Sequence, residues 1–533
     1  MKKNRVSINR VVEFGFKAKM PVRNPFFDVD FFAEFVTPSG KRIIVPGFWD
    51  GGNEWKIRYS SDEPGIHEFE TKSIPSIEGI SEQKGYCEVK KDKGEKNPLY
   101  KFGGPTVVDG KIVYKNGKEF FWLGDTWWMG LCSRLDRNGF KIITKDRIEK
   151  GFTVVQIVAG LYPDMDWYDP RGKNEGGYPY KKDFSEINPA YFKYADWKIG
   201  YLADSGIAPC IVGAWGYYLK LTGIETMKKH WRNLVARYAA YPVIWCLAGE
   251  TIMPYYLSET RDEDLLFQKS GWTEVARYLK QCDPFNRPLT AHPTNLGHEQ
   301  IEQPQLLDIN MLQTGHGSHQ SIENICLSIE KARHAFPEKP IVNGEVNYEG
   351  IGESCRQEIQ RMSFWASFLS GAKGFTYGAN GIWQVNVKNK PYGPSPHGRS
   401  WGDTPSWDVA YKLQGSYDVS TGKKILSEFQ WQNIVPCPEK IISKDKFSFA
   451  GEIPDTLLLI YVSPPCFSNG IEGLSHLKSN CKYQWYWVDP KDGRKRKGFV
   501  FQTDADGTWK TQKHFWGIVP VWQDWLIQIK EEK

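Results

Sequence analysis

The sequence has few of the features that mark membrane proteins or secreted, disulfide-rich proteins. No stretch approaches about 18 consecutive apolar residues, the length of a membrane-spanning helix. The N-terminal Met-Lys-Lys-Asn-Arg is followed by no apolar run of signal-peptide length. The ten cysteines form no Cys-x-x-Cys pair, and Cys210 and Cys246 lie in apolar stretches typical of buried strands. We therefore expect no membrane partner, free buried thiols and a cytoplasmic location, although a chain whose leader had been removed would look the same.

Motifs of several common enzyme classes are also missing. There is no Gly-x-Gly-x-x-Gly after the first strand of the central region, no Gly-x-Ser-x-Gly and no Walker loop. His292, His316 and His319 could be imagined as metal ligands, but no His-Glu-x-x-His or similar spacing supports this. We expect neither a metal ion nor a cofactor.

The charge of the chain gives no sign of a nucleic-acid partner. The net charge is +6, from 69 basic and 63 acidic residues, which is near balance for 533 residues. The densest basic run, residues 494–497, directly follows Asp492-Gly493, a pair typical of hairpin turns. A solvated turn explains these charges better than a polyanion site does.

What the sequence does have is length and aromatic side chains. A chain of 533 residues is too long for one compact core, so about two to four domains are expected. The 22 tryptophans, 26 tyrosines and 29 phenylalanines make up 14% of the residues. Such an excess fits either several β-sandwich cores or platforms that stack on sugar rings, and composition does not decide between them.

The two ends of the chain are typical of β-sandwiches. In residues 1–97, strand-like stretches at 28–35, 42–46 and 55–59 alternate with turn sequences rich in Gly, Pro and Ser. In residues 433–533, strand-like stretches lie at 456–462, 483–488, 498–502 and 525–529. We predict one β-sandwich domain at each end.

Between them, residues 98–432 alternate apolar strand-like stretches with amphipathic helical ones. The strand candidates are residues 120–123, 153–158, 208–212, 243–247, 289–291, 309–312, 341–342 and 375–377. The helix candidates are residues 145–150, 191–204, 225–239, 263–282, 322–335 and 356–369. Eight strands alternating with helices over about 310 residues predict a (β/α)8, or TIM, barrel. A doubly wound sheet is the structural alternative, and the missing Gly-rich turn argues against it.

Three carboxylates follow strand candidates directly. Asp125, Glu250 and Glu345 end the first, fourth and seventh, and active sites of such barrels lie at the C-terminal ends of the strands. Glu250 and Glu345 are 95 residues apart, about three βα units of roughly 30 residues, so both should reach one mouth of the barrel. A carboxylate after a strand can also simply cap the next helix, and spacing alone leaves both interpretations open. For Asp125, followed by Thr126, a structural or sugar-holding role is favoured over that of a nucleophile.

Glycoside hydrolysis needs a carboxylate pair of this kind. One carboxylic acid protonates the leaving oxygen, the other carboxylate attacks or stabilises the anomeric carbon, and their mutual repulsion separates the two pKa values. Side chains suited to stacking on a sugar or binding its hydroxyls follow most of the strands, and their joint placement is a stronger signal than any one of them. These candidates are Asp125, Trp127, Trp128, Gln156, Trp215, His292, Gln313, His316, Tyr348, Tyr377, Asn380 and Trp383.

The central motifs resemble those of the apiosidase-like glycoside hydrolases, a (β/α)8 family. The matching segments are residues 122–126, 151–156, 215–216, 245–250, 310–316, 343–345 with 348–349, and 376–383. Residues 47–51 and 55–58 resemble the β-sandwich that often precedes this barrel. Residues 486–490 and 524–525 resemble the small β-domain, of a type named for collagen binding, that often follows it. The resemblance implies that Glu250 is the acid/base and Glu345 the nucleophile.

Two positions depart from the family pattern. The family usually has Asp where this chain has Glu250, and the extra methylene moves the carboxyl group by about one bond length; misplacement of ~1 Å can cost ~100-fold in rate. Gly249 stands where the wider clan of barrel hydrolases usually has an Asn that binds the sugar 2-hydroxyl. The resemblance therefore implies a differently shaped pocket and another contact for that hydroxyl.

Together these observations predict a retaining glycoside hydrolase, in which Glu345 forms a glycosyl-enzyme and the two carboxyl groups lie about 5–5.5 Å apart, against roughly 6.5–9.5 Å for inversion. By analogy with the family, of which apiose is the example, the substrate is a terminal sugar on a plant-type oligosaccharide. Two alternatives remain: a non-catalytic carbohydrate-binding protein on a hydrolase-like barrel, and a scaffold or adhesion protein that acts through its β-domains. The sequence leaves open the sugar, the linkage, exo or endo action and homo-oligomerisation.

Overall fold

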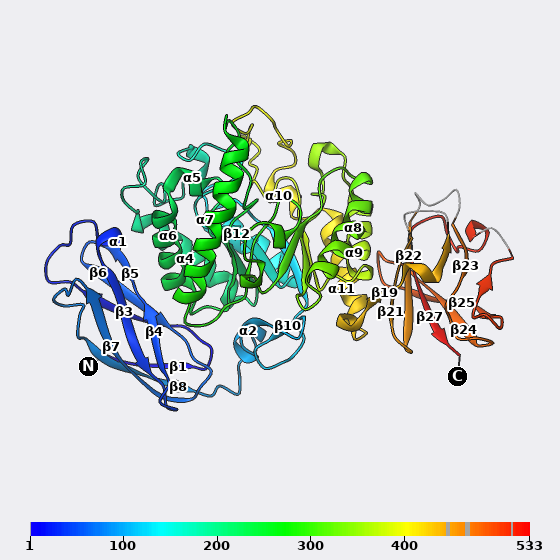
Figure 1. Cartoon of the computed structure of the whole chain (residues 1–533), viewed down its shortest axis with the longest axis horizontal. Helices are drawn as coiled ribbons and strands as arrows, with labels where there is room; N and C mark the ends of the chain where they lie inside the picture. The colour runs from blue at the N-terminus through cyan, green and yellow to red at the C-terminus, as the bar shows by residue number, and fades with distance from the viewer. Residues whose placement is uncertain (1, 444–447, 464–469, 513–514, 533) are drawn as a thin grey trace.

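The computed structural model describes residues 2–443, 448–463, 470–512 and 515–532. Three units follow one another along the long axis of the molecule: a β-sandwich, a barrel surrounded by helices and a second β-sandwich (Figure 1). The two chain ends lie in the two outer units. The prediction of a (β/α)8 barrel between two β-domains is confirmed, while the division at residues 97 and 432 stays a prediction.

The N-terminal unit packs two sheets around an aromatic core. The larger sheet has the order β1-β8-β7-β3-β4, with bounds Lys2–Ser7, Lys84–Lys90, Gly65–Ile74, Asp30–Val36 and Arg42–Pro46. The smaller has the order β2-β6-β5, with bounds Val12–Lys17, Glu54–Tyr59 and Phe48–Gly51. Alternation along β2 and β3 turns Phe14, Phe16, Phe31 and Phe35 into the core, where the rings pack together. The predicted strand at 28–35 begins later, because α1 (Pro25–Asp28) precedes it.

Eight parallel strands form the barrel, in the order β15-β14-β13-β12-β11-β18-β17-β16. Their bounds are β11 Trp122–Thr126, β12 Val154–Val158, β13 Ala208–Val212, β14 Ile244–Cys246, β15 Leu289–Thr290, β16 Asn310–Gln313, β17 Ile341–Glu345 and β18 Gly374–Tyr377. All eight predicted strands are present, with ends shifted by at most three residues. Strands such as β12 and β13 are buried along their whole length, as expected where helices cover a parallel sheet.

The ring of strands is nearly closed between β15 and β16. The N–H of Asp308 donates to the carbonyl of Leu289 (2.8 Å), and the carboxylate of Asp308 accepts from the N–H of Leu289 (2.8 Å). Thr290 Oγ1 donates to the carbonyl of Ile309 (3.0 Å). Because β15 has two residues, these contacts replace a regular ladder at this seam.

Helices surround the barrel. The longer ones are α3 Arg137–Glu149, α4 Pro189–Asp204, α6 Ile224–Tyr238, α7 Arg261–Cys282, α8 Gln320–Ala335, α9 Gln357–Leu369 and α11 Gln414–Leu426. Short helices α2 (Pro98–Lys101), α5 (Tyr218–Thr222) and α10 (Trp407–Ala410) and the hairpin β9–β10 (Pro105–Val108, Lys111–Tyr114) complete this unit. The six predicted helices are present. Helix α3 begins earlier than predicted because Asp136 caps it by accepting from the N–H of Gly139 (2.7 Å).

The C-terminal unit is a second pair of sheets. One has the order β19-β21-β22-β27-β24-β25, with bounds Val435–Pro436, Ser448–Ile453, Leu457–Val462, Trp525–Glu531, Lys482–Val488 and Lys495–Gln502. The other has the order β20-β23-β26, with bounds Ile441–Ser443, Ile471–Leu474 and Trp509–Lys510. The four predicted strands are present. Of the basic run 494–497, predicted as a turn, only Arg494 precedes the strand; the other three residues lie at the exposed start of edge strand β25.

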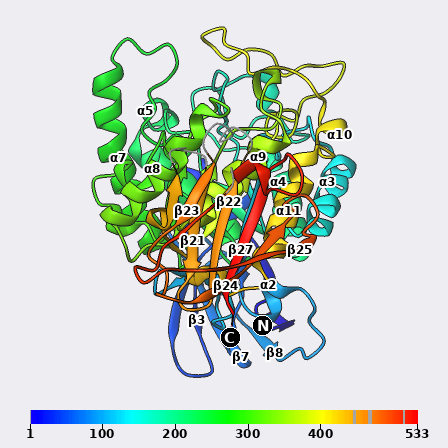
Figure 2. The ribbon, with the colours of Figure 1, turned by 90° about the vertical axis from the view of Figure 1, so that its right-hand side faces the viewer.

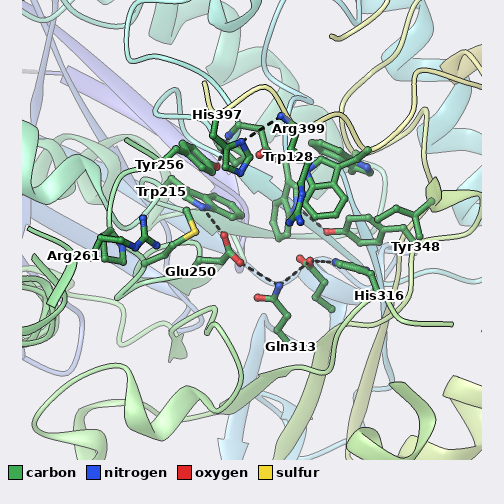
Figure 3. A pocket seen from close by; sticks show the side chains of 18 residues that line it. Trp128, Trp215, Glu250, Tyr256, Arg261, Gln313, His316, Tyr348, His397 and Arg399 are labelled. Carbon is green, nitrogen blue, oxygen red and sulfur yellow. Dashed lines mark hydrogen bonds and ion pairs between the residues drawn. The ribbon is translucent and has the colours of Figure 1, made fainter. Parts of the chain in front are cut away.

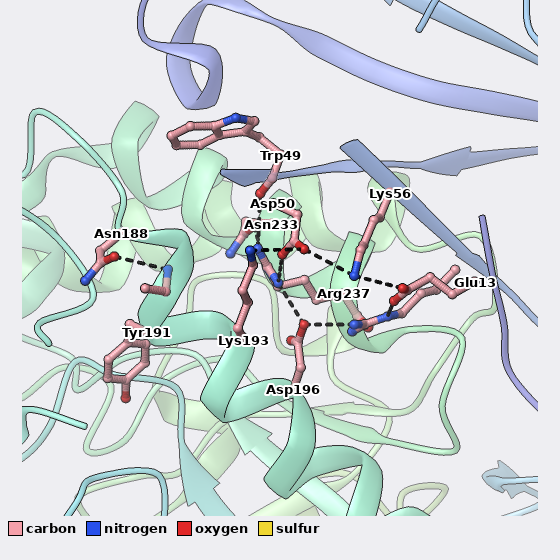
Figure 4. Close-up of polar contacts among 12 residues, drawn as sticks. Glu13, Trp49, Asp50, Lys56, Asn188, Tyr191, Lys193, Asp196, Asn233 and Arg237 are labelled. Carbon is pink, nitrogen blue, oxygen red and sulfur yellow. Dashed lines mark hydrogen bonds and ion pairs between the residues drawn. The ribbon is translucent and has the colours of Figure 1, made fainter. Parts of the chain in front are cut away.

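Buried ion pairs join the N-terminal sandwich to helices α4 and α6 (Figure 4). Arg58 of β6 donates to Asp196 on α4 (2.8 Å) and to the carbonyl of Arg237 on α6 (2.8 Å). Arg237 donates to the same carboxylate (2.8 Å) and lies 3.5 Å from Asp50 of β5. The two arginines therefore share Asp196 across the domain boundary.

A similar network joins the barrel to the C-terminal sandwich. Arg361 of α9 donates to both carboxylate oxygens of Asp524 (2.7 and 3.0 Å) and to Asp418 of α11. Tyr461 of β22 donates to Asp524 as well (2.7 Å). Figure 2 looks onto this sandwich, with α9 and α11 behind it.

Two expectations concern membrane spans and cysteines. Within the residues that the structure describes, no helix is both long enough and apolar enough to cross a membrane. The described cysteines are all free, and Cys466 lies outside the described residues.

Candidate active site

A cavity of about 290 Å³ opens at the C-terminal ends of the barrel strands. Both predicted catalytic carboxylates, Glu250 and Glu345, line it. Glu250, labelled in Figure 3, follows β14 by four residues, and Glu345 is the last residue of β17. This is the end of a (β/α)8 barrel at which active sites are found.

Glu250 is held in an unusual backbone conformation. Its φ is +39°, in the left-handed region that residues with a Cβ rarely adopt. One carboxyl oxygen accepts a hydrogen bond from the indole N–H of Trp215 (3.2 Å), and the other accepts from Gln313 Nε2 (3.3 Å). The carboxyl group is thereby aimed at the cavity, to which it is partly exposed.

Glu345 is placed by a β-bulge. Between Leu312 and Gln313 the register of β16 shifts against β17, so that Gln313 lies opposite Glu345. One oxygen of Glu345 accepts from His316 Nε2 (2.8 Å), and the other lies 3.1 Å from His292 Nε2. The Glu345 side chain is thus enclosed between two imidazoles.

One side-chain amide connects the two carboxyl groups (Figure 3). Gln313 Nε2 lies 3.3 Å from Glu250 Oε1 and 3.3 Å from Glu345 Oε1. These two oxygens are therefore at most about twice that distance apart. A single anomeric centre with its leaving group can contact both.

The two carboxyl groups have opposite pKa shifts. Burial raises the pKa of Glu250 to about 7, and the negative charge of Glu345 adds to this effect. Burial would also raise the pKa of Glu345, but the hydrogen-bonding and charge effects of His292 and His316 outweigh it and hold that pKa well below its usual range. Near neutral pH the site can therefore hold one protonated and one ionised carboxyl group.

Aromatic rings form the walls of the cavity. The indole N–H of Trp128 donates to the hydroxyl of Tyr348 (2.9 Å), and the Trp128 ring meets the His292 ring edge to face at 5.2 Å. Trp383 lies beside Tyr348, with ring centroids 6.1 Å apart. Burial and the charge of Glu345 raise the pKa of Tyr348, so this hydroxyl stays protonated. Such rings are suited to stacking on a sugar.

Six predicted sugar contacts do not line the cavity. Asp125 and Trp127 are fully buried beneath it: the Asp125 carboxylate accepts from the indole of Trp127 (2.6 Å) and from Arg147 Nε (2.6 Å). Arg147 on α3 thus compensates the buried charge of Asp125, which a strand-end pattern does not reveal.

Gln156, Tyr377 and Asn380 are three more. Gln156 donates to the carbonyl of Gly344 (2.9 Å), and Tyr377 donates to Glu349 (2.5 Å). Asn380 accepts from the indole of Trp383 (3.0 Å) and so orients a ring that does line the cavity.

His292 contacts a predicted catalytic carboxylate without lining the cavity. It is fully buried and does not line the cavity, yet it contacts the carboxylate of Glu345 directly. Trp128, Trp215, Gln313, His316, Tyr348 and Trp383 line the cavity, as their positions after the strands suggested.

Sequence patterns missed the loop residues of the site. Asp164, Tyr256 and Trp401 line the cavity, but they lie between six and 24 residues after the ends of β12, β14 and β18. The backbone N–H of Asp164 donates to the hydroxyl of Tyr256 (2.8 Å), and burial raises the pKa of Asp164. The two adjacent tyrosines that end at Tyr256 follow Glu250 closely, and they were the one sequence feature that pointed to these loop residues.

Arg261, His397 and Arg399 form an exposed part of the rim, to which the two arginines bring positive charge. Among the described residues, no group of three or more His, Cys, Asp or Glu side chains could hold a metal ion.

Comparison with known proteins places the chain in a family. The family described as apiosidase-like, catalytic domain, matches residues 109–433, more than half of the chain. The chain belongs to the apiosidase-like family. Residues 5–74 of this apiosidase-like protein match a domain of unknown function, DUF5060.

Solved structures show the same fold. A Bacteroides vulgatus protein provisionally described as a glycoside hydrolase is 18% identical, with a TM-score of 0.68, and the match covers 99% of this chain and 100% of that one. A glycoside hydrolase family 5 structure from the same organism is 22% identical, with a TM-score of 0.64, and the match covers 81% of this chain and 94% of that one. A comparison with curated proteins found no match.

The apiosidase-like protein is therefore a glycoside hydrolase, and its substrate is a carbohydrate. The resemblance drawn from the sequence motifs is confirmed at the level of the family and of the flanking β-domains. The roles of single residues remain predictions.

Proposed function

We propose that the chain is a retaining glycoside hydrolase with Glu250 as acid/base and Glu345 as nucleophile. The observation that carries the proposal is the pair of carboxyl groups on the two sides of Gln313. Because one nitrogen lies 3.3 Å from an oxygen of each, the gap between these oxygens cannot reach most of the roughly 6.5–9.5 Å range of inverting enzymes. It is compatible with the ~5–5.5 Å of retaining ones.

The protonation states suit this mechanism. Glu250, with its pKa raised by burial to about 7, begins as the neutral acid and protonates the leaving oxygen. The ionised Glu345 attacks the anomeric carbon as the bond to the leaving group breaks, which yields a glycosyl-enzyme. Glu250, now a carboxylate, then takes a proton from water, whose oxygen attacks the anomeric carbon and releases Glu345.

The size and polarity of the cavity suit a small sugar, and the proposal that it is a terminal sugar on a plant-type oligosaccharide rests on analogy with the family. A volume of about 290 Å³ is at the lower end of the ~300–1,000 Å³ range of small-molecule pockets, so it suits about one or two sugar rings. Gln313 Oε1 and His316 Nδ1 are buried without a hydrogen-bond partner among the described residues. Buried polar atoms of this kind gain from a partner, and sugar hydroxyls can supply it.

The proposal is tested by screening chromogenic glycosides and plant oligosaccharides, apiosides included, with the wild-type protein and its carboxylate variants. Glu345→Gln should lower kcat/KM by ~10³-fold or more while the thermal unfolding profile stays that of a folded protein, since the nucleophile is lost and the volume is kept. Glu353→Gln replaces an exposed glutamate at the end of the short 3-10 helix Ile351–Glu353; it is the matched control and should keep wild-type turnover.

Two outcomes would overturn the proposal. Near-normal turnover by Glu345→Gln would remove the nucleophile assignment. Tight binding of a sugar that the wild-type protein never cleaves would favour the non-catalytic carbohydrate-binding alternative.

A further inference from the structure

The residue before the predicted acid has no room for a side chain. A Cβ built on Gly249 would lie 2.2 Å from two carbons of the Trp215 ring. The indole therefore rests directly on the backbone of Gly249, and any other residue there would push it away.

The backbone around this contact is equally tight. The N–H of Gly216 donates to the carbonyl of Gly249 (2.7 Å), and the N–H of Gly249 donates to the carbonyl of Ala214 (2.9 Å). A Cβ on Gly216 would lie 2.5 Å from the carbonyl oxygen of Glu250. The segments that follow β13 and β14 are thus joined beyond the ends of their strands, with Trp215 between them and the cavity.

Trp215 is also fixed from its other side. Its ring meets the Trp128 ring edge to face at 5.5 Å and lies 6.0 Å from the His292 ring. It is 4% exposed, and its one polar atom, the indole N–H, donates to the carboxyl group of Glu250 (3.2 Å). A rigid ring thus presents a single donor to the predicted acid (Figure 3).

We propose that Trp215 is the positioning residue of the acid/base: its ring, seated on Gly249, aims the indole N–H at Glu250 and holds that carboxyl group toward Gln313. The inference rests on the proposed role of Glu250. It gives Trp215 a task beyond forming the pocket wall. It also gives a reason for glycine at position 249, because a side chain there would displace the ring that orients the neighbouring acid.

A positioning role differs from a wall role in what it does to the chemistry. An N–H donor favours the ionised form of a carboxyl group, so removing it should raise the pKa of Glu250. A misaligned acid slows the expulsion of poor leaving groups, which need protonation, and has little effect on good ones, which do not. Replacing a residue that only forms the pocket wall would change kcat/KM on all glycosides of one sugar by a similar factor.

The test uses Trp215→Phe, which keeps an aromatic ring and removes the donor. The probes are aryl glycosides of the sugar that the chromogenic screen identifies, from phenyl, a poor leaving group, to 2,4-dinitrophenyl, a good one. We expect kcat on the poorest leaving groups to fall ~10–100-fold, kcat/KM on the dinitrophenyl glycoside to change less than about 3-fold, and the alkaline limb of kcat/KM to move up by roughly half to one pH unit.

Two further variants sharpen the test. Gly249→Ala should reproduce the same pattern, because its Cβ displaces the Trp215 ring. Trp383→Phe removes another indole from the cavity, one whose N–H goes to Asn380, and should lower kcat/KM on all the glycosides by a similar factor.

A crystal structure of Trp215→Phe tests the inference without any substrate. We expect the Glu250 carboxyl group to leave Gln313, with the 3.3 Å contact between Oε1 and Nε2 lengthening beyond hydrogen-bonding distance. An unmoved Glu250, or equal losses on all leaving groups, would overturn the inference. Glu250→Gln on the same glycosides separates the two proposals. If the rate loss of Glu250→Gln does not depend on the leaving group, the proposed function fails. If the rate loss of Glu250→Gln depends on the leaving group and that of Trp215→Phe does not, only the proposed role of Trp215 fails.

Discussion

Glu250 and Glu345 are both glutamates, but their electrostatic surroundings differ. Burial and a neighbouring negative charge favour the protonated form of Glu250, while the imidazoles of His292 and His316 favour the ionised form of Glu345. Glu250 lies four residues after β14 and Glu345 is the last residue of β17, and this place at the C-terminal ends of strands made both predictable from sequence. The imidazole contacts were not predictable, because they depend on how the segments after β15 and β16 fold over the barrel mouth.

The pH dependence of activity follows from the raised pKa of Glu250. The free enzyme needs this group protonated, so kcat/KM should fall with rising pH, with a midpoint near pH 7. Rates from pH 4 to 9 on one glycoside would measure it. A profile flat up to pH 9 would contradict the assignment of Glu250 as the acid.

The same shift has a consequence for stability. A pKa raised above its unfolded value of about 4.5 means that the folded state binds the proton more tightly, so the contribution of Glu250 to stability is present at low pH and lost as pH rises through about 7. Glu250→Gln should therefore stabilise the barrel by ~1–3 kcal/mol at pH 8 and have a much smaller effect at pH 4. Thermal unfolding at the two pH values checks this, and equal effects at both would contradict it.

At the level of elements, the bulge between β16 and β17 decides where Glu345 points. Gly344 is needed there because a Cβ would lie 2.5 Å from the side chain of Met311. Sequence patterns located every barrel strand within three residues, since apolar stretches alternate with helical ones. They could not locate the bulge, because it depends on how β17 is paired with a strand about 30 residues away. They also missed helix α11, whose Gly422 packs against the Phe364 ring of α9.

A substitution in the bulge should separate activity from stability. Gly344→Ala should push the Met311 side chain away and displace Glu345, lowering kcat/KM ~100-fold at a cost of about 1–3 kcal/mol in stability. Combining it with Met311→Ala removes the clash and should restore part of the activity relative to Gly344→Ala alone. Kinetics and unfolding of the three variants test this; if the double variant is no more active than Gly344→Ala, the clash is not the cause.

At the scale of the whole molecule, the two β-sandwiches are fastened to the barrel by buried charges. Arg58 and Arg237 share Asp196 on the N-terminal side, and Arg361 pairs with Asp524 on the C-terminal side. The sequence showed three units and their order, because composition and periodicity change along the chain. It could not show these pairs, since their members are 41 to 163 residues apart and form no local pattern.

Breaking the N-terminal network should loosen the docking of the sandwich. Asp196→Ala leaves two buried arginines without their shared partner, which should cost about 3 kcal/mol or more. Glu34→Gln, which removes a partner of Arg42 and Lys72 on the exposed face of the same sandwich, should have a much smaller effect on stability, because water screens these charges. Calorimetric unfolding of both variants decides; equal effects would mean that the interface charges do not hold the domain.

The stereochemistry of hydrolysis tests the central claim most directly. A proton NMR spectrum taken in the first minutes of cleavage shows which anomer of the sugar is released before mutarotation mixes the two forms. Two displacements at one carbon, by Glu345 and then by water, predict that the first product has the configuration of the substrate. A first product of inverted configuration would contradict the account, because it would mean that water, and not Glu345, attacks the anomeric carbon.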